Sequence, residues 1–117
     1  MTMTVKIKRA YEKPARADGK RFLIDALWPR GVKKEDLKIE AWLKELAPST
    51  ELRQWFHHDP AKWQEFQERY RRELRAKKDA LEPLRQAAQR GTVTIVYSAR
   101  DEEHNNAVVL QRVLEGK

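Results

Sequence analysis

Polar side chains suited to binding an anion gather in three separate segments of this chain, at residues 25–31, 48–53 and 98–106. Arginine presents paired N–H donors to an oxyanion, and a helix start adds unpaired backbone N–H groups and the positive end of its dipole. Each segment combines such side chains with an expected helix start or strand end. The candidate anion-binding residues are Arg30, Ser49, Thr50, Arg100 and Asn105, with Trp28 as an aromatic wall of the same pocket.

Three further side chains in these segments are candidates for acid–base catalysis, namely Asp25, Asp101 and His104. Asp25 stands at the end of an apolar run, and a buried carboxylate requires a partner. It therefore either holds an arginine in place or has a shifted pKa that suits proton transfer.

Each of these residues also has a purely structural explanation. Arg30 can pair with Asp25, and Ser49 and Asp101 are ordinary helix N-caps. Arg100 precedes three acidic side chains and can form a local ion-pair cluster with them. The residue types alone leave both interpretations open.

Metal and nucleotide sites are not expected. His57 and His58 are adjacent, so on a helix they point about 100° apart and do not face one metal easily. The chain has no cysteine and only four glycines, and none of the glycine-rich phosphate motifs occurs. We expect no metal and no cofactor.

The elements that position these segments follow from the apolar pattern. Residues 4–9 alternate as a strand with a lysine-bearing face, which favours a sheet edge, and residues 21–27 form an apolar run typical of a buried strand. The two together resemble a hairpin, joined by a cationic loop. Residues 39–46 fit a helix or a strand, because the pattern is too short to separate the two.

Four helices and one more strand are expected after that stretch. Ser49 or Thr50 caps the first helix, and Asp59–Pro60 starts the second, whose stripe of Trp63, Phe66, Tyr70 and Leu74 faces the core. The third helix is opened by Asp79 or Glu82, has Pro83 in its first turn and stops at Gly91. Residues 92–98 are expected to form a strand, and Asp101 to cap the last helix.

Strands that alternate with helices predict a single α/β domain over residues 1–117, with a mostly parallel sheet of about four strands flanked by helices. Ligands gather at the carboxyl ends of parallel strands. We therefore expect Arg30, Ser49 and Arg100 to converge on one anion.

The positive charge of the chain suggests a second class of function. Net charge is +7, and residues 1–34 hold ten lysines and arginines against three acidic side chains. Such a surface attracts nucleic-acid phosphates, and an exposed Trp28 or Trp55 would stack on bases. A non-catalytic interaction domain is the third alternative. No signal-peptide stretch or membrane-length apolar run occurs, so a cytoplasmic protein without membrane contact, acting on a small anionic ligand, is the leading expectation.

Long strings of this sequence resemble the YeaO-like family, a bacterial group with the domain of unknown function numbered 488. The strings cover nearly the whole chain in order: Leu23–Gly31, Trp42–Ser49, Glu51–Arg53, Trp55–Phe56, Tyr97–Asp101 and His104–Ala107. The resemblance implies a bacterial α/β domain and favours a strand at residues 42–46, but it implies no particular reaction. Typical members read Asp-Arg-Leu-Trp-Pro-Arg-Gly at the first motif, where this chain has Ala26. The resemblance thus implies a weaker anion site, or one more dependent on Arg30 and Arg100.

Overall fold

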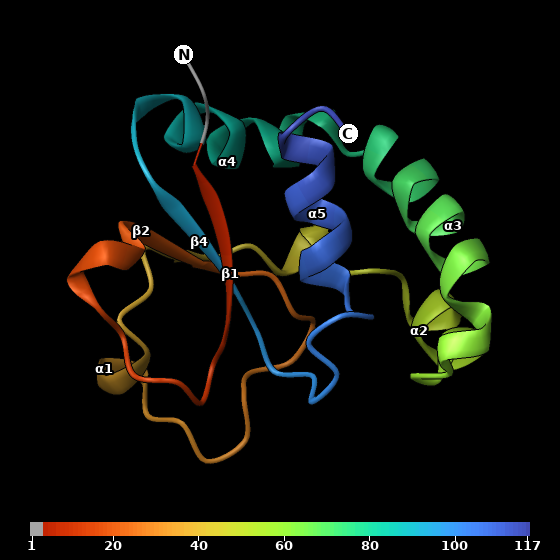
Figure 1. Ribbon diagram of the computed structural model, residues 1–117, viewed down its shortest axis with the longest axis horizontal. Coiled ribbons are helices and arrows are strands. Elements are labelled where there is room, and N and C mark those ends of the chain that lie inside the picture. The colour runs from red at the N-terminus through yellow and green to blue at the C-terminus, as the bar shows by residue number, and fades with distance from the viewer. Residues whose placement is uncertain (1–3) are drawn as a thin grey trace.

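Four parallel strands form the central sheet of this protein, seen here in a computed structural model that describes residues 4–117 (Figure 1). The order across the sheet is β1-β4-β2-β3, and every neighbouring pair is parallel. The strands are β1 (Val5–Arg9), β2 (Lys20–Leu23), β3 (Ala41–Trp42) and β4 (Val93–Tyr97). The prediction of an α/β fold with a parallel sheet is confirmed, as is the edge position of β1.

The expected hairpin of the first two strands is wrong, because β4 lies between β1 and β2. All five residues of β4 are buried, as befits a central strand covered on both faces. Its side chains alternate: Ile95 and Tyr97 join the larger core, whereas Val96 packs with Leu23 and Leu37 on the other face.

Helices cover one face of the sheet, and loops with one short helix cover the other. The helices are α1 (Lys34–Leu37), α2 (Thr50–Phe56), α3 (Trp63–Arg75), α4 (Lys78–Arg90) and α5 (Asn106–Leu114), with short 3-10 turns η1 (Arg16–Asp18), η2 (Lys44–Leu46) and η3 (Pro60–Lys62). Side chains from α2 to α5 share one core cluster with Phe22 and Ile24, whereas α1 adds Leu37 to the opposite face. Figure 1 shows α5 in front of the sheet, with α2 and α3 to its right.

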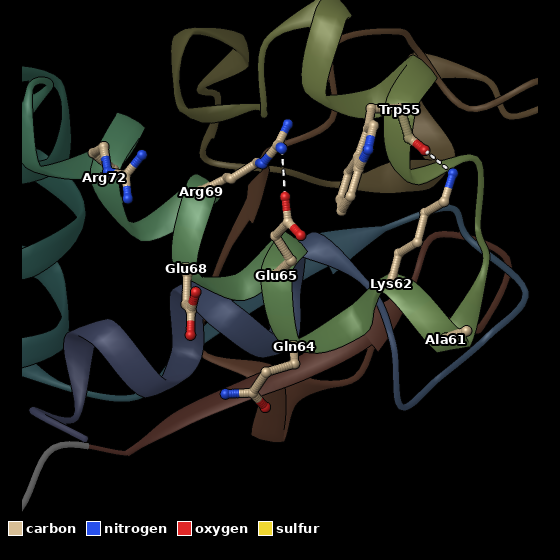
Figure 2. Close-up of a pocket in the computed structure, with 8 residues that line it drawn as sticks. All are labelled: Trp55, Ala61, Lys62, Gln64, Glu65, Glu68, Arg69 and Arg72. Carbon is tan, nitrogen blue, oxygen red and sulfur yellow. Dashed lines mark hydrogen bonds and ion pairs between the residues drawn. The ribbon is translucent and has the colours of Figure 1, made fainter.

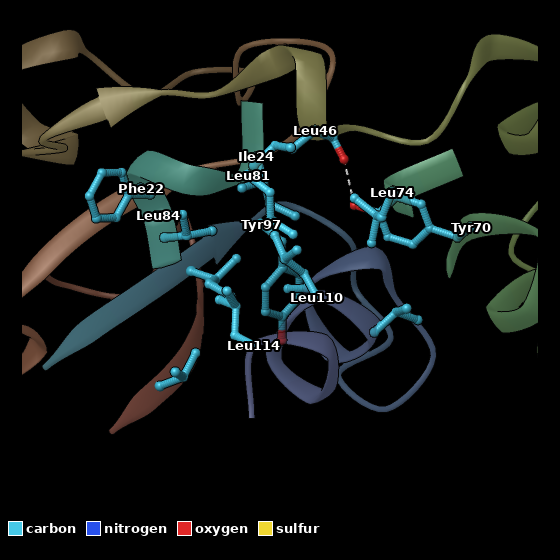
Figure 3. Packing of buried hydrophobic residues seen from close by; sticks show 14 of the residues in the cluster. Phe22, Ile24, Leu46, Tyr70, Leu74, Leu81, Leu84, Tyr97, Leu110 and Leu114 are labelled. Atoms are coloured by element: carbon cyan, nitrogen blue, oxygen red, sulfur yellow. Dashed lines mark hydrogen bonds between the residues drawn. The ribbon is translucent and has the colours of Figure 1, made fainter. Parts of the chain in front are cut away.

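The apolar stripe of α3 faces the larger core, as its spacing predicts. Phe66, Tyr70 and Leu74 are buried, and Trp63 is half-buried against them. The Tyr70 hydroxyl donates to the carbonyl of Leu46 at 2.6 Å, so its polar atom is satisfied inside the core (Figure 3). Burial, with the nearby charges of Asp25 and Glu73, raises the pKa of this phenol and keeps it neutral.

The strand interpretation of residues 42–46 is correct only for Trp42, which ends β3. Pairing stops after Trp42, and the chain turns into η2 at Lys44. The partner strand β2 ends at Leu23, so the ladder between β2 and β3 ends with the pair of Leu23 and Trp42. The turn instead buries Leu46 completely and presents its carbonyl to Tyr70.

Four helix or strand boundaries also differ from expectation. Asp59 caps the 3-10 turn η3, and α3 begins only at Trp63. β2 ends at Leu23, and residues 25–27 form a bend. α4 starts at Lys78 without a side-chain cap, so Pro83 lies inside the helix rather than in its first turn. Asn105 rather than Asp101 caps α5, because its Oδ1 accepts the backbone N–H of Val108 at 3.1 Å. Within residues 4–117, no helix combines the length and apolarity needed to cross a membrane.

Candidate functional site

A pocket of about 730 Å³ opens where β2 and β4 end. Its wall comes mainly from the loop after β2, residues 25–30, and from the loop between β4 and α5, residues 98–101 with 105–106. Both loops follow the carboxyl ends of parallel strands, the usual place for a ligand in an open α/β sheet. The remaining wall residues are Tyr11, Pro48, Arg53, Phe56, His58 and Phe66.

The structure brings most of the candidate side chains to this pocket and leaves the others outside it. The candidates that line the pocket are Asp25, Trp28, Arg30, Arg100, Asp101 and Asn105. Ser49 lines a separate hollow beside α3, Thr50 is exposed on α2, and His104 lies behind Asp101.

Ser49 does not converge with Arg30 and Arg100, contrary to expectation. Its backbone N–H and hydroxyl donate to the Glu73 carboxylate at 2.8 and 2.6 Å, and its Oγ accepts the N–H of Leu52. Its donors are therefore already used. Thr50 Oγ1 likewise accepts from the Arg53 guanidinium at 3.0 Å. Both residues organise the start of α2.

Asp25 joins the two loops that form the pocket. Its Oδ2 accepts the backbone N–H and the hydroxyl of Ser98 at 2.9 and 2.7 Å, and its Oδ1 accepts from the Asn106 side chain at 3.0 Å. The pair with Arg30, the structural alternative for both side chains, does not form among the residues described. Asp25 thus ties the end of β2 to the end of β4 and the start of α5.

Side chains at the end of β1 and just after it hydrogen-bond the backbone of the same two loops. Arg9 donates from Nε to the carbonyl of Ala99 at 2.9 Å and from Nη2 to that of Ser98 at 3.3 Å. The Tyr11 hydroxyl donates to the carbonyl of Arg30 at 3.1 Å, and the Arg9 guanidinium lies over the Tyr11 ring. These contacts hold the backbone on which Arg30 and Arg100 stand.

Two arginines of the pocket remain available for a ligand. Arg30 and Arg100 are exposed, and their side chains have no hydrogen bond or ion pair within residues 4–117. The ion-pair cluster expected between Arg100 and the acids after it is absent from that part of the chain. Two free guanidinium groups on one pocket attract an anion and can bind it with paired hydrogen bonds.

Arg53, which ends the polar segment at residues 48–53, adds to this positive wall, and His58, which the sequence did not mark, lines the pocket as well. Arg53 is anchored by Nε to the carbonyl of Pro48 at 3.2 Å. His57 and His58 both have positive φ values, 47° and 53°, which turn the chain after α2 and bring His58 to the pocket. Such a pair of left-handed residues leaves no local pattern to recognise, because neither is a glycine.

Asp101 is a turn residue bonded to the third histidine. Its Oδ1 accepts the backbone N–H groups of Glu103 and His104 at 2.9 and 3.0 Å, and its Oδ2 lies 2.9 Å from the His104 Nδ1. The Glu103 N–H bond and the His104 contact hold the pKa of this carboxyl below its usual value. The His104 ring stands edge-on to Trp63, with their centroids 5.2 Å apart.

The tryptophans considered for base stacking already have partners. The Trp28 indole donates to the carbonyl of Val32 at 2.7 Å and packs edge-on against Trp42. Trp55 lines a shallow hollow along α3, where Figure 2 shows its indole between the side chains of Arg69 and Lys62. A base would have to displace a cation to stack there.

Part of the basic charge near the N-terminus is used inside the fold. Arg21 is buried and pairs with Asp18 at 2.7 Å, and Lys8 pairs with the same carboxylate. Together with Arg9, these cations make contacts within the fold and do not contribute fully to a basic surface that a nucleic acid could contact. No group of three metal-ligating side chains occurs in the portion of the chain that the structure describes.

Fold and pocket together define a small α/β domain with a cationic recess at the carboxyl ends of its strands. The chain belongs to the DUF488-N3i family, described as the inactive DUF488-N3 subclade, whose model matches residues 4–117. The family resemblance seen in the sequence is therefore confirmed.

Relatives of similar length support this membership. The chain is 41% identical over 113 residues to the uncharacterized protein Rv3073c of Mycobacterium tuberculosis, covering 97% of this chain and 95% of that protein. It is also 41% identical over 108 residues to the uncharacterized protein YeaO of Escherichia coli, covering 92% and 94%. No solved structure matches the chain.

Proposed function

We propose that this protein binds a small molecule bearing a phosphate or carboxylate group in the pocket at the ends of β2 and β4. The observation that carries the proposal is a pair of arginines, Arg30 and Arg100, whose side chains have no partner within residues 4–117 and which stand on two loops that Asp25 ties together. Guanidinium groups match the geometry of an oxyanion, and the nearby Arg53 reinforces the positive potential.

The state of the acidic side chains favours binding over turnover. Asp25 accepts three hydrogen bonds, which assign it to joining the two loops. Asp101 has a lowered pKa, which makes it a weak base at neutral pH. The word "inactive" in the description of the family agrees with a pocket that binds without catalysing. Ala26, which lines the pocket in place of the arginine of typical members, points the same way.

Titration with inorganic phosphate, followed by amide NMR shifts, tests this proposal. We expect Arg30→Ala and Arg100→Ala each to weaken phosphate binding about tenfold, the loss of one or two charge-assisted hydrogen bonds. Both arginines are exposed, so the free energy of unfolding should change by less than about 0.5 kcal/mol. Arg90→Ala, an exposed arginine at the end of α4, is the matched control and should leave binding intact.

Three results would count against this pocket. They are the absence of binding by both phosphate and organic phosphates, equal effects of Arg30→Ala and Arg90→Ala, and unfolding of the Arg30→Ala variant at room temperature. Binding only to DNA or RNA oligomers, lost steeply with added salt and unaffected by Arg30→Ala, would instead favour a nucleic-acid surface over the pocket.

A further inference from the structure

We infer that the anion bound in this pocket is carried on an apolar ring, so that the ligand is an aromatic phosphate or carboxylate rather than a bare inorganic ion. This inference rests on the proposed function and specifies the ligand class of the same site. It follows from the apolar part of the pocket wall, which the arginines do not explain.

The large hydrophobic side chains most open to solvent both belong to this pocket. Within residues 4–117, Leu27 is 73% exposed and Tyr11 is 49% exposed, and no other large hydrophobic side chain is classed as exposed. The other large hydrophobic side chains of residues 4–117 are buried or half-buried, so exposed apolar surface of this kind is confined to the pocket. Exposed apolar surface with polar groups around it marks a binding groove, because covering it removes apolar area from water.

The pocket wall continues this apolar surface with aromatic rings. Phe56 and Phe66 border it from the core, where both rings are buried and stack on one another with their centroids 4.2 Å apart. Trp28 and Pro29 line it as well. A flat ring fits a wall of this composition better than a hydrated ion does, because stacking and edge contacts add to apolar burial.

The size of the pocket also favours an organic ligand. Its volume of about 730 Å³ lies in the range of sites that enclose small organic molecules. An inorganic phosphate, with five heavy atoms, would occupy only a small part of that space. The remaining volume would then hold water against Leu27 and the aromatic wall.

Apolar and cationic groups share one rigid loop, which lets one ligand contact both. Leu27 and Arg30 are three residues apart in the loop after β2, which is tied to Ser98 through the Asp25 carboxylate at one end and to the Tyr11 hydroxyl through the Arg30 carbonyl at the other. A ring lying on Leu27 thus leaves an attached anion within the part of the pocket that Arg30 lines. A small aromatic anion is therefore the ligand that this pocket fits.

Calorimetric titration with phenyl phosphate, inorganic phosphate and phenol tests the inference. Phenyl phosphate should bind at least about tenfold more tightly than inorganic phosphate, since burying part of a ring and of Leu27 contributes on the scale of one buried apolar side chain. Phenol should bind weakly, because it lacks the charge. Leu27→Ser should lower the affinity for phenyl phosphate about fivefold more than the affinity for inorganic phosphate.

The fold of this variant is not at risk, because Leu27 is mostly exposed. Equal affinity for phenyl phosphate and inorganic phosphate would overturn the inference and leave the proposed anion site standing. Failure of both to bind would overturn the proposed function itself. Dimerisation in sedimentation velocity that Leu27→Ser abolishes, with phenyl phosphate affinity unchanged, would assign the apolar patch to a second copy of the chain and overturn the inference.

Discussion

Filled hydrogen bonds distinguish the acidic side chains of the pocket from Arg30 and Arg100. Asp101 accepts two backbone N–H groups and contacts His104, whereas Arg100, one residue earlier, has no side-chain partner in the part of the chain described. A side chain whose hydrogen bonds are filled stabilises a turn, while one left free is available to a ligand. Neighbours in sequence therefore have different roles here.

The lowered pKa of Asp101 predicts a pH dependence of stability. Its carboxyl holds its proton less tightly in the folded protein than in the unfolded chain, so the ionised group stabilises the fold above the unfolded pKa of about 3.9. That contribution is lost as the pH falls through the lower folded value. Asp101→Asn keeps the shape but cannot ionise, so its stability deficit at neutral pH should shrink toward pH 3.

Urea unfolding of both proteins from about pH 6 to pH 3 measures that deficit. Other carboxyls titrate equally in both proteins, so the difference between the two isolates Asp101. A difference independent of pH would show that the charge of Asp101 does not stabilise the turn.

At the scale of elements, α4 shows packing overriding a local helix breaker. Pro83 is the sixth residue of the helix, so it has no N–H to donate to the carbonyl of Asp79. The helix continues because Leu81, Leu84 and Ala88 bury one face in the larger core. The sequence pattern placed this proline in a first turn, where its missing N–H would not lower the stability of the helix.

Pro83→Ala should therefore stabilise the protein. Restoring the helical hydrogen bond and removing the ring clash should raise the free energy of unfolding by about 1–2 kcal/mol, after the greater freedom of the unfolded chain is subtracted. Gln89→Ala, an exposed change later in the same helix, should stay within about 0.5 kcal/mol. Denaturant unfolding measures the free energy of unfolding of the two variants. A loss of stability in Pro83→Ala would contradict the prediction and mean that the proline ring contributes packing.

At the scale of the whole molecule, the pocket depends on contacts between distant parts of the chain. Asp25 bonds Ser98 and Asn106 across 73 and 81 residues, and Arg9 bonds Ala99 across 90. The two arginine-bearing loops meet only because β4 is inserted between β1 and β2. Binding and global folding are therefore coupled through Asp25.

Asp25→Ala should impair both stability and binding. Leaving the N–H of Ser98 and the amide of Asn106 without their acceptor should lower the free energy of unfolding by about 2 kcal/mol. Loosened loops should also weaken phosphate binding, whereas Arg30→Ala should weaken binding alone. Urea unfolding and phosphate titration of both variants separate the two roles. Unchanged stability in Asp25→Ala would remove its assignment as the link between the loops.

Local features of this protein could be predicted from its sequence, because they depend on neighbouring residues. The apolar run at 93–97 is a buried strand, and the Phe66, Tyr70 and Leu74 stripe faces the core. Ser49 caps α2 as its side chain suggests. The family follows from long contiguous strings of the same kind.

Non-local pairing decided the rest. Strand order, the capture of Ser49 by Glu73, and the arrival of Arg53 and His58 at the pocket each depend on which distant segments meet. A hydrogen bond across many residues leaves no periodic trace in either partner, so spacing along the chain does not reveal it. The sequence by itself therefore determined which side chains suit an anion, and the tertiary structure determined which of them remain free to bind one.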